Sequence, residues 1–127
     1  MTNERMTKVY NTRETMPDDM IAGYVAAYPA QIALGANPRV VRRKKLLTHG
    51  DKVAVLIGNG SGHEPIAMGF VGEGLLDANV VGDVFTAPSP DAILDGIDEV
   101  TETGDLKPAV SVFGLIGLIG IVAAVGV

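Results

Sequence analysis

The chain has 127 residues, enough for one domain with a buried core, and 47% of them are apolar. Its formal net charge of −5 argues against a nucleic-acid-binding protein, which ordinarily presents a basic surface. The absence of cysteine excludes disulfide bonds, thiolate catalysis and cysteine-ligated metals, and two histidines are too few for a histidine-rich metal site.

The first 16 residues are polar and predict a frayed or extended N-terminal arm. They lack the apolar core of a signal peptide, so a cytoplasmic protein is expected. A helix is predicted next, because Pro17 suits the first helical position and Asp18 and Asp19 suit the positive end of the helix dipole. Apolar residues then recur at helical spacing as far as Tyr28, and Pro29 ends the pattern.

Residues 30–51 are expected to form a connection with a short apolar patch at residues 40–41. This connection contains five of the ten Lys and Arg residues, namely Arg39, Arg42, Arg43, Lys44 and Lys45. Two interpretations stay open for this basic cluster. The favoured one is a solvated connection before a strand, and the other is a binding site for phosphate or an acidic partner.

The continuous apolar run at residues 52–57 predicts a strand buried on both faces, as in a parallel sheet. Residues 65–71 predict a helix, although the glycines in and after it weaken the pattern, and residues 79–85 predict a second strand. Ser89 and Pro90 are typical of a helix start, and that helix should end near Gly104.

Strands that alternate with helices indicate an α/β fold with a largely parallel sheet flanked by helices. Ligands of such sheets bind at the carboxyl ends of the strands. The segments 58–63 and 82–83 are expected at those ends.

The segment after the first strand reads Gly58-Asn59-Gly60-Ser61-Gly62-His63-Glu64-Pro65. Its spacing fits neither common nucleotide-binding motif, because His63 stands where a dinucleotide fingerprint needs its third glycine and no Gly-Lys-Ser/Thr follows for a P-loop. An ordinary strand-to-helix turn and a small-ligand site remain as alternatives of similar weight.

The imidazole of His63 favours the ligand site, because packing gives no reason for it beside Gly62. An imidazole ordinarily titrates near about pH 6.5, so it can accept and return a proton near neutrality. The N–H groups of Gly60, Ser61 and Gly62 are expected to hold a ligand oxygen, with a further hydrogen bond from the Ser61 hydroxyl. Glu64 either orients the imidazole or, as we favour, lies on the surface.

The chain resembles the dihydroxyacetone kinase family, in its K subunit or the equivalent domain of single-chain enzymes. The likeness covers about residues 17–100 and rests on four runs: Gly60-Ser61-Gly62-His63-Glu64-Pro65, Gly69-Phe70-Val71-Gly72, Gly74-Leu75-Leu76-Asp77-Ala78 and Gly82-Asp83-Val84-Phe85-Thr86-Ala87-Pro88-Ser89.

The resemblance implies a site for dihydroxyacetone or a similar short ketose, which the enzyme phosphorylates. It implies that Gly60, Ser61, Gly62 and His63 contact substrate and that His63 is the catalytic proton acceptor. It also implies a phosphoryl donor held outside this chain, either ATP or a nucleotide-bearing L-type partner subunit that a phosphotransferase chain recharges. No cofactor or metal is expected on this chain itself.

The chain also departs from the family pattern. Asn59 stands where a further glycine is usual, and the turn is expected to survive because asparagine tolerates left-handed backbone. The family's later histidine, which captures the substrate carbonyl, has no counterpart, since His49 precedes the glycine-rich segment and is expected in a solvated loop. A lysine and an aspartate expected after the third strand are also missing, and Asp105 is not assigned that role.

Residues 109–127 carry no charged side chain and are just long enough to span a bilayer. We favour a buried strand region that is truncated or altered by a shifted reading frame, over a membrane tail.

The sequence therefore predicts an arm at 1–16, the N-terminal part of a K-type domain at 17–108 and an apolar tail at 109–127. The leading hypothesis is a ketose-binding portion of a kinase that is inactive alone, with a homodimer possible and a membrane or nucleic-acid partner not expected. The alternative is a non-catalytic triose-binding or regulatory paralogue.

Overall fold

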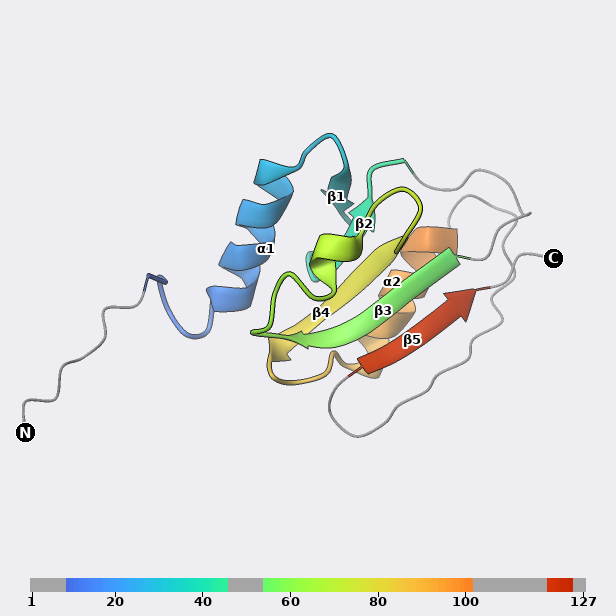
Figure 1. Ribbon diagram of the computed structural model, residues 1–127. Coiled ribbons are helices and arrows are strands. Elements are labelled where there is room, and N and C mark those ends of the chain that lie inside the picture. The colour runs from blue at the N-terminus through green and yellow to red at the C-terminus, as the bar shows by residue number, and fades with distance from the viewer. Residues whose placement is uncertain (1–8, 46–53, 102–118, 125–127) are drawn as a thin grey trace, which may run out of the picture.

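The computed structural model describes residues 9–45, 54–101 and 119–124 (Figure 1). Its elements, in chain order, are helix α1 (Met16–Ala27), strands β1 (Ile32–Leu34), β2 (Val40–Arg43) and β3 (Ala54–Ser61), the short 3₁₀-helix η1 (Met68–Phe70), strand β4 (Ala78–Val84), helix α2 (Pro90–Thr101) and strand β5 (Ile119–Ala124).

The five strands form one sheet in the order β1-β2-β4-β3-β5. Among these described strands, β3 and β4 are the one parallel pair, and the other three neighbouring pairs are antiparallel. The expected α/β class is confirmed, but the expectation of a largely parallel sheet is wrong. A continuously apolar strand indicates that both faces of the sheet are covered, but it does not indicate the direction of the strand.

Both faces of the sheet are covered by apolar side chains, with α1 and η1 on one face and α2 on the other (Figure 1). Neighbouring residues of one strand point to opposite faces. Thus Val40 and Val80 pack in the cluster beneath α2, while Val41 and Val81 pack in the cluster beneath α1 and η1. This division explains why the central strands are apolar throughout.

Both long helices begin where the sequence predicts. Pro17 lies in the first turn of α1, together with Asp18 and Asp19. The Ser89 hydroxyl accepts a hydrogen bond from the Ala92 N–H (3.3 Å), so the predicted N-cap of α2 is confirmed.

The predicted helix over 65–71 is wrong, because the described structure there is the three-residue η1. Gly69 lies so close to Pro65 that a Cβ on it would be 2.7 Å from the proline Cβ. Gly69 therefore allows the chain to form a tight, irregular crossover between β3 and β4 instead of an α-helix.

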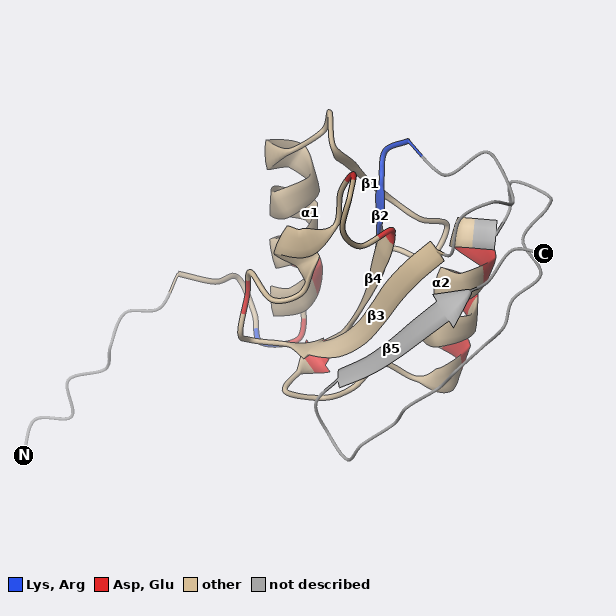
Figure 2. Ribbon diagram, turned by 45° about the vertical axis from the view of Figure 1, so that its right-hand side comes forward, with Lys and Arg blue, Asp and Glu red and all other residues tan. Residues whose placement is uncertain are grey.

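The expected connection over 30–51 contains the antiparallel pair β1 and β2, so that expectation is wrong for this part. The three arginines of the basic cluster are held in ion pairs with acidic residues from elsewhere in the chain. Arg42 pairs with Glu99 of α2 (2.6 Å) and Arg43 with Asp77 (2.9 Å). Figure 2 shows the basic end of β2 and the acidic residues along α2. The interpretation as a solvated connection therefore fits Lys44 and Lys45, which are exposed, but does not fit the three arginines.

Strand β5 is the part of the apolar segment 109–127 that the structure describes, and it pairs antiparallel with β3 from Ala54↔Ala124 to Asn59↔Ile119. His49, Asp105 and residues 109–118 lie outside the described residues. Within the described part of the chain, no helix is long and apolar enough to cross a membrane. The division at residues 16 and 108 stays a prediction.

Candidate functional site

The glycine-rich run is strand rather than turn for most of its length. Strand β3 continues to Ser61, and the chain turns at Gly62, whose φ of 109° is in the region that favours glycine. Asn59 lies within β3 and has no positive φ, so its predicted left-handed role is wrong.

The glycines let another segment of the same chain cross the end of the sheet. A Cβ on Gly60 would lie 2.7 Å from the Thr86 main-chain nitrogen, and one on Gly82 would overlap the Thr86 main-chain oxygen. A Cβ on Gly58 would meet the side chain of Ile93. On this face, the close approach that the sequence suggested for a ligand is made by residues 85–88 and α2.

The parallel pairing of β3 and β4 brings two segments together at one end of the sheet. The Phe85 N–H donates a hydrogen bond to the Ser61 carbonyl oxygen (2.8 Å). The Phe85 ring lies beside Gly62, at 3.2 Å from where a Cβ would be, and its side chain is 73% exposed. Phe85 also has a positive φ of 51°. It is a site residue that sequence reasoning missed, although it stands in one of the quoted runs.

Ser61 supplies an unmet hydrogen-bonding group at this edge. Its side chain is 2% exposed, and its hydroxyl has no partner among the described residues. Buried polar groups in proteins are ordinarily paired. The Ser61 hydroxyl therefore fits a small ligand or a water molecule that reaches the strand end.

His63 is half-buried and held by its own loop. Its Nδ1 lies 2.9 Å from the Ile66 carbonyl oxygen. Because a carbonyl only accepts, Nδ1 must carry the proton in this contact, and Nε2 of the neutral ring keeps its lone pair. The imidazole is thus arranged as a proton acceptor through Nε2.

Glu64 contacts the backbone rather than the imidazole. Its two carboxylate oxygens lie 3.2 and 3.0 Å from the Gly62 nitrogen, so the N–H of Gly62 donates to this side chain. One of the three N–H groups expected in the cradle, that of Gly62, is therefore paired with a side chain of the same loop. The side chain is exposed, as the favoured sequence interpretation expects.

No group of three or more His, Asp or Glu residues in the described part of the chain could hold a metal ion. The polar groups at the site are the Ser61 hydroxyl, the His63 imidazole, the Gly62 main-chain amide and the Glu64 carboxylate, all of which can form hydrogen bonds with a small polar ligand.

This is an α/β domain with a sheet covered on both faces and polar groups at the ends of a parallel strand pair, the place where α/β proteins commonly bind ligands. Residues 22–110 match the model of the Dak1 domain, and the chain belongs to this family. The resemblance found in the sequence is thereby confirmed.

Two relatives show the extent of the similarity. The chain is 43% identical over 96 residues to a dihydroxyacetone kinase of Citrobacter freundii, covering 72% of this chain and 17% of the relative. It is 39% identical over 90 residues to the dihydroxyacetone-binding subunit DhaK of the PEP-dependent dihydroxyacetone kinase of Escherichia coli. This match covers 71% of this chain and 25% of that subunit.

Two solved structures are also similar. The C. freundii dihydroxyacetone kinase in complex with AMP-PNP and Mg²⁺ matches with a TM-score of 0.65 and 42% identity, over 74% of this chain and 18% of that one. The dihydroxyacetone kinase operon co-activator Dha-DhaQ matches with a TM-score of 0.56 and 35% identity, over 66% of this chain and 25% of the co-activator. The chain therefore spans only about a quarter or less of these four proteins.

Proposed function

We propose that this chain is the ketose-binding part of a dihydroxyacetone kinase, with Gly60, Ser61, Gly62 and His63 around the substrate. The observation that carries the proposal is the buried Ser61 hydroxyl, which has no partner among the described residues, two positions before a histidine whose Nε2 is left to accept a proton. The family supports the substrate class, because relatives at about 40% identity are dihydroxyacetone kinases.

In this proposal His63 acts as the general base. Its Nε2 takes the proton from a substrate hydroxyl as that oxygen bonds to the transferred phosphorus and the bond from phosphorus to the donor's leaving oxygen breaks. The Ile66 carbonyl holds the ring by Nδ1, so the accepting atom has a fixed direction. The Ser61 hydroxyl orients the substrate in this proposal.

The phosphoryl donor is held outside the described site. The proposal leaves two donors open, ATP and a nucleotide-bearing L-type partner, because the similar proteins include a kinase in complex with AMP-PNP and Mg²⁺ and a PEP-dependent subunit. A cytoplasmic location remains part of the proposal.

We expect the 127-residue chain alone to have no kinase activity, because the later histidine and the lysine and aspartate that the resemblance requires have no counterpart in it. Incubation of the purified chain with ATP and dihydroxyacetone tests this. Turnover that His63→Ala abolishes would contradict the expected inactivity, although it would support the role of His63.

A second candidate function is a non-catalytic triose-binding or regulatory protein. The similarity to a co-activator, at 35% identity, favours it specifically. The two candidates separate when the remaining part of a dihydroxyacetone kinase K subunit, a nucleotide-bearing partner and dihydroxyacetone are added together. Phosphorylation would support the kinase, whereas saturable binding without phosphorylation would support the regulatory protein.

A further inference from the structure

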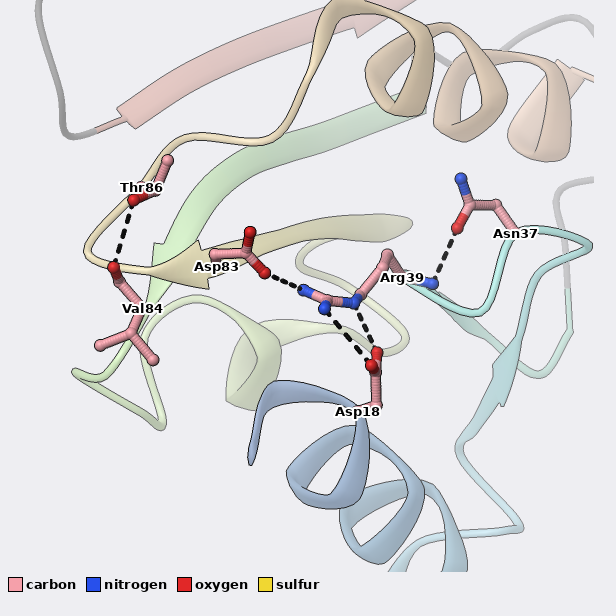
Figure 3. A network of polar contacts seen from close by, with 6 residues as sticks. All are labelled: Asp18, Asn37, Arg39, Asp83, Val84 and Thr86. Atoms are coloured by element: carbon pink, nitrogen blue, oxygen red, sulfur yellow. Dashed lines mark hydrogen bonds and ion pairs between the residues drawn. The ribbon is translucent and has the colours of Figure 1, made fainter. Parts of the chain in front are cut away.

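Arg39 joins the first turn of α1 to the carboxyl end of β4 (Figure 3). Its Nε and Nη2 lie 2.5 and 3.4 Å from the two carboxylate oxygens of Asp18, in the first turn of α1. Its Nη1 lies 3.1 Å from the Asp83 carboxylate, near the carboxyl end of β4. One guanidinium therefore holds two carboxylates, a geometry that its planar fork of donors suits.

The backbone of Arg39 is itself fixed. Its carbonyl accepts a hydrogen bond from the Val81 N–H (2.8 Å), and its N–H donates to the Asn37 side chain (2.9 Å). The Asn37 amide nitrogen donates in turn to Asp95 of α2 (2.7 Å). These contacts fix the point on the backbone from which the Arg39 side chain extends.

Asp83 connects this network to the glycine-rich segment. Its carbonyl accepts a hydrogen bond from the Thr86 N–H (3.0 Å), closing a turn that contains Phe85. That turn touches the candidate site twice, because Phe85 donates to the Ser61 carbonyl and the Thr86 backbone packs against Gly60. The Thr86 hydroxyl further ties the turn to the Val84 carbonyl (3.2 Å).

We infer that Arg39 and Asp83 are positioning residues for the proposed ketose site. By holding the carboxyl end of β4, the pair places the turn at residues 83–86, which sets the position of Gly60 and Ser61. The Asp83 side chain is 72% exposed, so packing does not hold it in place. Its ion pair with Arg39 is the contact that restrains it among the described residues. This inference rests on the proposed function for the identity of the ligand.

The test uses the full 127-residue chain and dihydroxyacetone, with binding followed by NMR. Arg39→Gln and Asp83→Asn should each weaken binding by about tenfold, as expected for residues coupled in one network. The double variant should bind no more weakly than either single variant.

Arg42→Gln is the matched control. It breaks an ion pair of similar length with Glu99, but Arg42 pairs in register with Ala78, at the opposite end of β4. Arg42→Gln should leave the affinity for dihydroxyacetone within about twofold of wild type. It should lower the unfolding midpoint at least as much as Arg39→Gln and Asp83→Asn do. Equal weakening by the control, or wild-type binding by Arg39→Gln and Asp83→Asn, would overturn the inference.

Amide hydrogen exchange separates this inference from the proposed function, because it needs no ligand. Exchange at the Phe85 N–H should accelerate in Arg39→Gln and Asp83→Asn but not in Arg42→Gln. Unchanged protection of Phe85 in the first two variants would overturn the positioning role whatever the ligand does. If exchange at Phe85 accelerates in these two variants but the wild-type chain does not bind dihydroxyacetone, the proposed function is contradicted. The positioning of the strand end by Arg39 and Asp83 is then still supported.

Discussion

The Nδ1 atom of His63 and the carbonyl oxygen of Ile66 are 2.9 Å apart. The same carbonyl lies 3.5 Å from the side-chain nitrogen of Asn59, which also donates to the Gly60 carbonyl (2.8 Å). The loop that carries His63 is therefore held to β3 by a buried amide, and the ring is held to the loop.

This contact predicts the tautomer of His63. In the neutral ring the proton should reside on Nδ1, because the Ile66 carbonyl can only accept a hydrogen bond. Nitrogen-15 chemical shifts of the imidazole in the free chain measure this directly. A ring protonated mainly on Nε2 would mean that the atom we assign as proton acceptor is a donor.

Substitution of the glycines at the sheet end should destabilise the fold. Gly82→Ala places a methyl group against the Thr86 carbonyl, and Gly60→Ala places one against the Thr86 nitrogen. Each should lower the free energy of unfolding by about 1–3 kcal/mol, the usual cost of overpacking, with Gly82→Ala the worse.

Gly72→Ala is the control for these two variants, because a Cβ there meets nothing within 4 Å and its φ is not positive. Urea unfolding should find it within about 1 kcal/mol of wild type. Equal stability of all three variants would show that the crossing of residues 85–88 over the glycines is not as close as described.

Ser61→Ala should separate folding from binding. The hydroxyl is buried without a described partner, so its removal should leave the free energy of unfolding unchanged or raise it by up to about 1 kcal/mol. Binding of dihydroxyacetone should weaken if the hydroxyl bonds to the ligand. Destabilisation with unchanged binding would assign Ser61 a purely structural role.

Removal of the Glu64 carboxylate should strengthen ligand binding. In the free protein that carboxylate accepts from the Gly62 N–H, so a ligand oxygen must displace it. We expect Glu64→Ala to bind dihydroxyacetone severalfold more tightly. Glu73→Ala makes the same change in net charge on an exposed turn residue and should bind as wild type does. Weaker binding by Glu64→Ala would indicate that the carboxylate supports the site instead.

The sequence predicted both long helices and the two central strands, because their patterns are local. Pro17 and Ser89 act within one helical turn, and buried strands are apolar wherever both faces are covered. The antiparallel pairing of β2 with β4 and of β5 with β3 was not predictable, because the apolar pattern of a buried strand is the same in either direction. Strands β1 and β2 were missed because they are short and because Arg42 is neutralised by Glu99, 57 residues away.

The candidate site was predicted in part. His63 and the glycine-rich segment do lie at the carboxyl end of a parallel strand pair, as expected. The role of the glycines was not predictable from their spacing, since the segment that approaches Gly60 is Thr86 of the same chain. The unpartnered Ser61 hydroxyl and the bond between Gly62 and Glu64 are likewise products of the folded geometry.

The most direct test of the central claim is an NMR titration of the isotopically labelled 127-residue chain with dihydroxyacetone. We expect saturable chemical-shift changes centred on Gly60, Ser61, Gly62 and the His63 ring, and smaller changes in Ser61→Ala. Absence of saturable changes at these four residues, or saturable changes confined to the hollow lined by Tyr10 and Met20, would contradict it.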